Sequence, residues 1–146
     1  MDRTTTNDSI RIDTKRGTAV FQEPSPGIVV YRVVGFADIE IFRALLPDLQ
    51  AALTRTGRLE LFADAGRLEG YDARFRLEWV DWFIANREKL VDVHVYVRSK
   101  LARMGVSVAN LATGGMLRPY ASVTLFDAAL RKSAPTWRRQ SIPPAS

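Results

Sequence analysis

The chain has 146 residues, of which 25% are charged and 47% hydrophobic, with one histidine and no cysteine. This length and balance are typical of one soluble globular domain. The lack of cysteine excludes thiol catalysis, disulfide bonds and cysteine-ligated metal centres, and the single histidine, His94, excludes a multi-histidine metal site within one chain. We expect no metal and no other cofactor.

The formal charge of +5 is unevenly distributed. Residues 98–146 carry eight basic side chains and one acid, Asp127, whereas residues 1–97 carry 13 basic and 15 acidic side chains. A polarised chain of this kind can attract anionic partners. Because the basic residues are spread over two predicted helices and a tail, a solvated surface is the simpler interpretation. Peripheral contact with an anionic membrane is kept as an alternative, and a nucleic-acid partner is not expected.

No targeting or membrane-spanning segment is evident. Residues 1–17 are polar and mixed in charge, unlike a secretory signal. The longest stretch of low charge, residues 101–117, contains Arg103 and Asn110 and is shorter than the ~20 apolar residues that a membrane span needs. The protein is therefore expected in the cytoplasm.

The N-terminal part predicts edge strands followed by a core strand. Residues 1–8 are rich in threonine, asparagine and aspartate and are predicted to be flexible. Apolar and polar residues alternate over 9–15 and again over 18–22, so one or both segments should be edge strands. After a turn rich in proline and glycine, residues 28–34 are apolar on both faces, as expected in a sheet that is covered on both sides.

A helix and a second core strand follow. Asp38 is the predicted N-cap of a helix over residues 39–54, whose apolar residues recur at helical spacing. Pro47 should kink or divide that helix. Residues 58–63 read as the second core strand, and residues 64–70, with two glycines, as a loop.

The next segment predicts a second helix over residues 73–89, with Asp72 as its cap, and a third core strand over residues 91–97. A third helix is expected over residues 100–112. Four large aromatic residues fall on one face of the second helix: Phe75, Trp79, Trp82 and Phe83.

The C-terminal part predicts a short strand over residues 121–126 and a last helix from about Asp127 to Lys132. The proline-containing tail, residues 138–146, is expected to be disordered. Strands that alternate with single helices favour parallel pairing. We therefore predict an α/β domain over residues 9–137, with one mixed, mostly parallel sheet of four to five strands covered by about four helices.

This element order and four local features resemble a known group of proteins. The features are Val33-Val34-Gly35, the tryptophans Trp79 and Trp82, the Val-His-Val-Tyr-Val strand that leads into Arg98-Ser99-Lys100, and the segment from Leu125 to Leu130. Over residues ~9–137 the chain resembles the STAS-like superfamily of anti-sigma-factor antagonists and the related STAS/SEC14-like bacterial proteins. The resemblance implies a STAS-like fold and a non-enzymatic regulatory module of bacterial signalling that acts through protein–protein contact.

The chain departs from that superfamily at one functional position. The antagonists carry a phosphorylatable serine or threonine at the start of the second helix, in an Asp-Ser-Ser/Thr-Gly type of motif. Here residues 63–73 contain no hydroxyl group except that of Tyr71, and no serine or threonine occurs from Gly57 to Arg98. The usual phosphoserine switch is therefore not expected. Asp72 could imitate a permanently phosphorylated residue, although simple helix capping explains it more directly.

A binding mouth is predicted at one edge of the sheet, because ligands of parallel sheets usually bind beyond the carboxyl ends of the strands. Polar residues at these ends could bind a ligand or a partner, or they could be loop residues joined by an ion pair. Acid–base catalysis would need one carboxyl group with a raised pKa, and no enzyme is expected. The candidate mouth residues are Asp64, Glu69, Tyr71, Asp72, Arg98, Ser99 and Lys100.

The third predicted helix is a candidate interaction helix. It has no charge between Arg103 and Arg118, and several small residues fall near one line. Small residues permit tight packing on the sheet. The alternative is an exposed, weakly polar patch for dimerisation or for contact with a membrane surface. The candidate residues are Arg103, Met104, Gly105, Val108, Ala109 and Ala112.

The four aromatic residues of the second helix most simply form the contact between helix and sheet, where large rings bury much area. They could instead wall a cavity for an apolar, lipid-like ligand, as in the CRAL-TRIO lipid carriers. His94, in mid-strand between valines, is expected to be a core residue with satisfied hydrogen bonds rather than a catalyst. The expected partner is a protein, which could be a second copy of the chain, and an apolar ligand is the alternative.

Overall fold

The structure is a computed structural model and describes residues 1–6 and 8–144. One sheet of seven strands runs through the molecule, with the strands side by side in chain order. The strands are β1 (Asp2–Thr5), β2 (Ile10–Asp13), β3 (Gly17–Ser25), β4 (Ile28–Ala37), β5 (Leu59–Tyr71), β6 (Leu90–Val97) and β7 (Leu117–Tyr120). The helices are α1 (Ile39–Thr56), α2 (Ala73–Ala85), α3 (Lys100–Thr113) and α4 (Val123–Ser133), with a 3₁₀ turn at Arg87–Lys89.

The predicted α/β class with one sheet and four helices is confirmed, but the predicted strand number and the mostly parallel pairing are wrong. The sheet has seven strands, and its pairings from β1 to β4 are antiparallel while those from β4 to β7 are parallel. The physical reason is the length of the connections. Short turns join the first four strands and allow only antiparallel neighbours, whereas a helix separates each later pair. β1 gave no apolar signal because all four of its residues are exposed.

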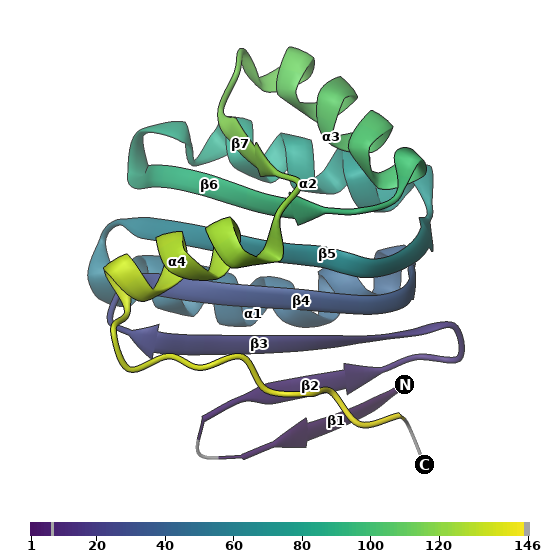
Figure 1. Cartoon of the computed structure of the whole chain (residues 1–146), viewed down its shortest axis with the longest axis horizontal. Helices are drawn as coiled ribbons and strands as arrows, with labels where there is room; N and C mark the ends of the chain where they lie inside the picture. Colours follow the sequence, from purple (N-terminus) through teal and green to yellow (C-terminus); the bar gives the residue numbers. More distant parts are fainter. Residues whose placement is uncertain (7, 145–146) are drawn as a thin grey trace.

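The two faces of the sheet are covered differently (Figure 1). Helices α1, α2 and α3 cover one face and enclose the larger hydrophobic core. Helix α4 and the C-terminal tail cover the other face over a smaller core. Since both faces are covered, β4 is apolar on both sides apart from Arg32, whereas β6 places its valines on one face and Asp92, His94 and Tyr96 on the other. The smaller core consists of Val30, Phe62, Tyr96, Phe126, Leu130, Ala134 and Trp137.

Each helix begins at a residue whose side chain accepts a hydrogen bond from a backbone N–H of the first turn. The four capping residues are Asp38, Asp72, Ser99 and Ser122. Helix α1 continues through Pro47 without a break, so the predicted division of this helix is wrong.

The largest differences from the predicted element boundaries are in β5 and β7. Residues 64–70, predicted as a loop, belong to β5, because β5 pairs with β4 as far as Tyr71 opposite Ala37, with two shifts of register on the way. The strand predicted over 121–126 lies four residues earlier, as β7. Ser122 starts α4 directly after it, and the proline within β7 is tolerated because this strand is at the edge of the sheet.

The two ends of the chain also differ from the sequence prediction. Part of the segment predicted to be flexible, Asp2–Thr5, pairs with β2 as strand β1, and Asn7 lies outside the described residues. Residues 138–144, predicted to be disordered, run in front of β4, β3 and β2 (Figure 1). Ile142 is only 8% exposed there, which gives this tail an apolar anchor. Among the described residues, none of the helices combines the length and the hydrophobicity needed to cross a lipid bilayer.

Candidate functional site

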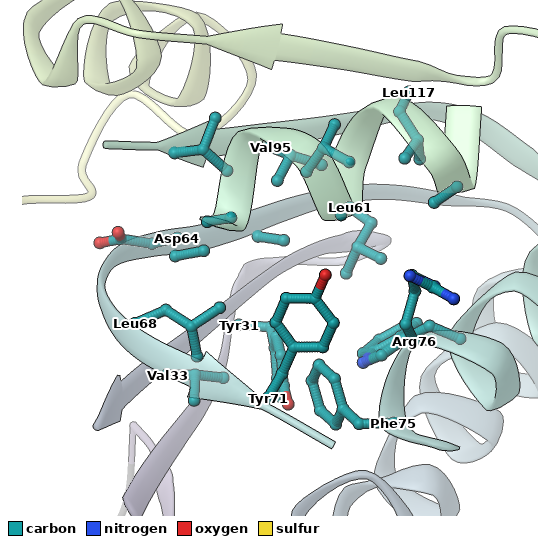
Figure 2. Close-up of a pocket in the computed structure, with 18 of the residues that line it drawn as sticks. Tyr31, Val33, Leu61, Asp64, Leu68, Tyr71, Phe75, Arg76, Val95 and Leu117 are labelled. Atoms are coloured by element: carbon teal, nitrogen blue, oxygen red, sulfur yellow. The ribbon is translucent and has the colours of Figure 1, made fainter. Parts of the chain in front are cut away.

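An apolar cavity of about 120 Å³ lies between α2, α3 and the sheet (Figure 2). Its floor comes from alternate residues of β4, β5 and β6, which point to the same face of the sheet. Small side chains on both sides of the cavity, including Ala63, Ala65 and Ala109, leave the space unfilled. Apolar cavities of this order stay dry and accept small apolar molecules. The aromatic residues of α2 pack in the larger core, as expected for the contact between helix and sheet, and Phe75, Trp79 and Phe83 also line the cavity.

Tyr31 contributes an unpaired polar atom to this apolar lining. The residue is 3% exposed, and no described residue makes a hydrogen bond with its hydroxyl group. The ring of Trp79 packs edge-on against the ring of Tyr31, with the two centroids 5.2 Å apart. Burial raises the pKa of Tyr31 well above its usual range. A buried hydroxyl without a partner costs free energy, and this oxygen is shielded from solvent beside the cavity.

Arg76 is the second polar feature of the cavity. Besides Asp64, whose carboxylate is bonded on the other face of the sheet, it is the one charged residue in the lining, and it has no ion-pair partner within residues 1–6 and 8–144. Arg76 is half-buried, and its guanidinium group lies at the side of the cavity opposite Leu68 and Val33 (Figure 2). The surface of the cavity is therefore almost wholly apolar, and the Arg76 side chain lies at its edge.

Helix α3 closes the cavity with its inner side and exposes apolar residues on its outer side. Gly105 and Ala109 face inward and are buried, whereas Arg103 and Ala112 are exposed. We call the exposed apolar residues the α3 stripe. They lie at intervals of three or four residues, and their exposed fractions are 47% for Leu101, 58% for Met104, 47% for Val108 and 86% for Leu111. The structure thus divides the candidate interaction residues between the two sides of the helix.

The predicted mouth residues are not brought to one place. Asp72 and Ser99 cap helices α2 and α3, and Tyr71 lines the apolar cavity. Glu69 and Lys100 are exposed, whereas Asp64 and Arg98 line a different cavity, on the α4 face of the sheet. The cause is the continuation of β5 to Tyr71, which sends its residues alternately to opposite faces.

Asp64 is the centre of a buried ion-pair network on the α4 face. Its carboxylate accepts hydrogen bonds from Arg32 Nε at 3.1 Å, Arg139 Nη1 at 2.7 Å and the Gly66 N–H at 2.9 Å. Arg139 also donates two bonds to Asp127 of α4, at 2.9 and 2.7 Å. The bonds to Asp127 and Asp64 raise the pKa of Arg139, whereas burial lowers the pKa of Arg32. The network fastens the C-terminal tail to the sheet and to α4.

His94 is satisfied on both ring nitrogens. Nδ1 lies 2.8 Å from the Tyr120 hydroxyl and Nε2 lies 2.8 Å from Glu60 Oε2, while the ring stacks on Phe62 with centroids 4.2 Å apart. Ser133 donates to the other Glu60 oxygen at 2.6 Å and does not contact the histidine. This arrangement holds α4 against the sheet through Glu60 and Ser133, and the hydroxyl group within reach of the imidazole is the phenol of Tyr120.

Glu60, Asp92 and His94 place their ligand atoms within 4.8 Å of one another. The Asp92 carboxylate already pairs with Arg118 Nε at 2.8 Å, and both His94 nitrogens are hydrogen-bonded within the protein. The residues present are therefore better explained as a hydrogen-bonded cluster than as a set of metal ligands.

Sequence reasoning missed the Asp64 network and the tail residues that form it. Arg139 is 75 residues away from Asp64 in the chain, in a segment whose prolines favoured disorder. Trp137, which is 6% exposed, was the available signal, because an aromatic residue in a polar tail indicates a docking point.

No protein-family model matches the chain, and no curated protein matches it. Solved structures of similar fold include the following two. One is an uncharacterized protein of the DUF3478 family with a SpoIIAA-like fold from Shewanella loihica PV-4, with a TM-score of 0.57 and 14% identity over 87% of this chain and 98% of that one. The other is an anti-sigma factor antagonist from Mycobacterium paratuberculosis, with a TM-score of 0.57 and 19% identity over 82% of this chain and 99% of that one. The predicted STAS-like fold is confirmed by these likenesses.

Proposed function

We propose that this chain is a non-enzymatic regulatory module that acts through protein–protein contact, with the α3 stripe as its contact surface. The exposure of four large apolar side chains on one helix carries this proposal. Soluble proteins rarely leave such residues together in water unless they meet a partner. The likeness in fold to an anti-sigma factor antagonist supports a role in bacterial regulation.

The geometry of α3 favours a protein partner over a membrane. The helix is held rigidly, with its N-terminus capped by Ser99 and its C-terminus ended by Gly114 in the left-handed conformation. A preformed apolar helix face can fit into a groove on another protein. Such a groove binds side chains that are spaced by three and four positions along the helix. Lys100 and Arg103 beside the stripe fit a groove whose rim is acidic.

This contact would not depend on phosphorylation at the start of α2. No serine or threonine lies between Gly57 and Arg98, and the Asp72 carboxylate accepts a hydrogen bond from the Arg74 N–H at 2.9 Å as an ordinary helix cap. We therefore propose that the partner is bound without the phosphoserine switch of the antagonists.

Site-specific photo-crosslinking in the source cells tests the surface. A photoreactive residue in place of Leu111 should give a discrete protein adduct, and one in place of Gln50, exposed on α1, should not. The adduct should disappear when Met104→Asp and Val108→Asp are added, with thermal stability unchanged, because both side chains are exposed. An adduct with a second copy of the chain would support self-association through the same surface.

Two outcomes would contradict this function. One is an adduct that survives the two aspartate substitutions. The other is the absence of any protein adduct together with binding to phosphatidylglycerol vesicles that the aspartates abolish, because the stripe would then serve membrane contact.

The cavity favours a second candidate function, the binding of an apolar ligand. Its walls are almost wholly apolar, and the polar side chains nearest to a bound molecule would be those of Tyr31 and Arg76. This combination suits a short hydrocarbon chain that ends in an anionic group. Native mass spectrometry of the protein purified from its source should then show a bound mass of that class.

Octanoate and octanol serve as probes for this second function. Arg76→Gln should weaken the binding of octanoate and leave that of octanol unchanged, and the control Arg74→Gln, at an exposed position of the same helix, should alter neither. Failure of both probes to bind, with no co-purified mass, would exclude the ligand function.

A further inference from the structure

We propose a second, independent binding site, for a small phosphate-bearing anion, on the α4 face of the sheet. A cavity of about 210 Å³ lies there. Four arginines line it together with a single acid, Asp64. The four are Arg32 and Arg67 of strands β4 and β5, Arg98 after β6, and Arg139 of the tail.

The position of this cavity is the one at which parallel sheets bind ligands. Val34 of β4, Gly66 of β5 and Tyr96 of β6 line it, so it lies near the carboxyl ends of β4 and β6, beside the point at which β5 extends beyond β6. Val123 in the first turn of α4 forms part of the wall. The free N–H groups of that turn add a partial positive charge, which supports the charge of the arginines.

The arginines are not all occupied within the protein. Arg32 and Arg139 bind Asp64, and Arg139 also binds Asp127. Arg67 and Arg98 are exposed, and neither has a hydrogen-bond or ion-pair partner for its side chain in the part of the chain that the structure describes. Two guanidinium groups at one cavity are thus left without a counter-charge.

The surplus charge determines the class of ligand. Four arginines against Asp64 and Asp127 leave a net charge of +2. A phosphomonoester carries a charge of about −1.5 to −2 at neutral pH. The planar guanidinium group of arginine donates two parallel hydrogen bonds to phosphate oxygens and stays charged at any physiological pH. The cavity is walled by α4 and by the tail, which suits a small molecule better than a polymer.

The C-terminal tail completes this site. Arg139 and Ile142 line the cavity, and Arg32 donates to the Gln140 carbonyl oxygen at 2.6 Å. A ligand held by Arg139 would favour the docked position of the tail, since anything that binds one state stabilises it.

Calorimetric titration with inorganic phosphate and with glycerol 3-phosphate, at constant ionic strength and with glycerol as the uncharged reference, tests the proposal. The double variant Arg67→Gln/Arg98→Gln should raise the Kd for phosphate by about tenfold or more, because two charge-assisted contacts are lost. Both residues are exposed and make no side-chain bond within the described part of the chain, so the variant should fold normally. The matched control is Arg58→Gln/Arg74→Gln, which removes two exposed arginines away from the cavity and should leave the Kd unchanged.

Backbone amide chemical shifts give an independent readout. Phosphate should shift the amides of Gly66 and Val123, which line the cavity, and leave those of α3 unchanged. The proposal is wrong if phosphate does not bind, if the double variant binds as tightly as the original chain, or if the control loses affinity to the same extent. It is also wrong if the shifts map to another face.

Discussion

The side chain of Tyr71 occupies the space that a side chain at Gly105 would need. A Cβ atom on Gly105 would lie 2.6 Å from the Tyr71 hydroxyl oxygen and 2.9 Å from the adjacent ring carbon. This close approach seats α3 on the end of β5 and forms one wall of the apolar cavity. It also explains why a small residue is needed on the inner side of α3, whereas large apolar residues are accepted on its outer side.

Gly105→Ala is therefore expected to destabilise the fold. Alanine is favoured over glycine in a helix by about 1 kcal/mol, but the clash should outweigh this gain and lower the free energy of unfolding by about 1–3 kcal/mol. Urea unfolding measures the change. Ser107→Ala, at an exposed position of the same helix, is the control and should stay within about 0.5 kcal/mol. In a Tyr71→Ala background the cost of Gly105→Ala should vanish, and a cost that persists there would contradict the contact.

Tyr31→Phe is expected to stabilise the protein, because it removes a buried hydroxyl group that has no hydrogen-bond partner among residues 1–6 and 8–144. The gain should be about 1–2 kcal/mol at neutral pH. The folded-state pKa of Tyr31 is raised by burial above its unfolded value of about 10. Above that pH the unfolded chain releases a proton that the folded chain retains, so the original chain loses stability as pH rises.

The difference in unfolding free energy between Tyr31→Phe and the original chain should therefore be constant below about pH 9 and should grow above pH 10. Urea unfolding across this range provides the measurement. A difference that stays flat to pH 11 would show that the hydroxyl group reaches water.

Filling the cavity is expected to stabilise the protein and to compete with an apolar ligand. Ala63→Val adds two methyl-sized groups toward the cavity from a strand position, where valine is favoured, and should raise the free energy of unfolding by about 1 kcal/mol. The contrasting control is Ala19→Val, since Ala19 is 0% exposed in the packed core and does not line the cavity. That substitution should destabilise by about 1–3 kcal/mol. Equal effects at the two positions would mean that the cavity is closed in solution.

Removing the Asp64 carboxylate is expected to lower the free energy of unfolding by more than removing that of Asp127. Asp64→Asn leaves the buried Arg32 without its counter-charge and should lower the free energy of unfolding by about 3 kcal/mol. Asp127→Asn affects Arg139, whose side chain is 28% exposed and keeps Asp64, and should cost about 1 kcal/mol. Chemical denaturation of the two variants measures both losses, and a larger loss for Asp127→Asn would contradict the prediction. The double change Arg32→Met/Asp64→Leu should recover most of the loss, because an apolar pair can replace a buried ion pair.

The central elements of the fold could be predicted because their residues repeat with a clear period. The apolar runs of β4 and β6 and the capped helix α3 stand close to where periodicity placed them. The three antiparallel pairings at the N-terminal side could not be predicted in full, since a strand such as β1 with all residues exposed has no hydrophobic pattern. The end of β5 was predicted as a loop because it contains glycines, which are typical of loops. In the structure, one of these glycines, Gly66, allows the Tyr96 ring to lie against the strand.

The candidate site was predicted only in part because it depends on which face of β5 each residue occupies. Asp64 and Tyr71 follow one another closely in the chain and end on opposite faces of the sheet. One residue of error in a strand register reverses the side of every later side chain, and β5 contains two such shifts. The contacts of Arg139 lie beyond any local pattern, since they join the tail to residues far away in the chain.

The sheet order also determines where a fusion partner can be attached. β1 and β7 form opposite edges of the sheet. Helix α3 packs against β5, β6 and β7, toward the β7 edge. At the β1 edge, tail residues Gln140 to Pro143 line a groove with Thr4 and Thr6. A fluorescent protein or a surface tether joined through Met1 would therefore emerge at the edge remote from α3. Immobilising the chain by that end leaves the outer side of α3 open to whatever approaches it from solution.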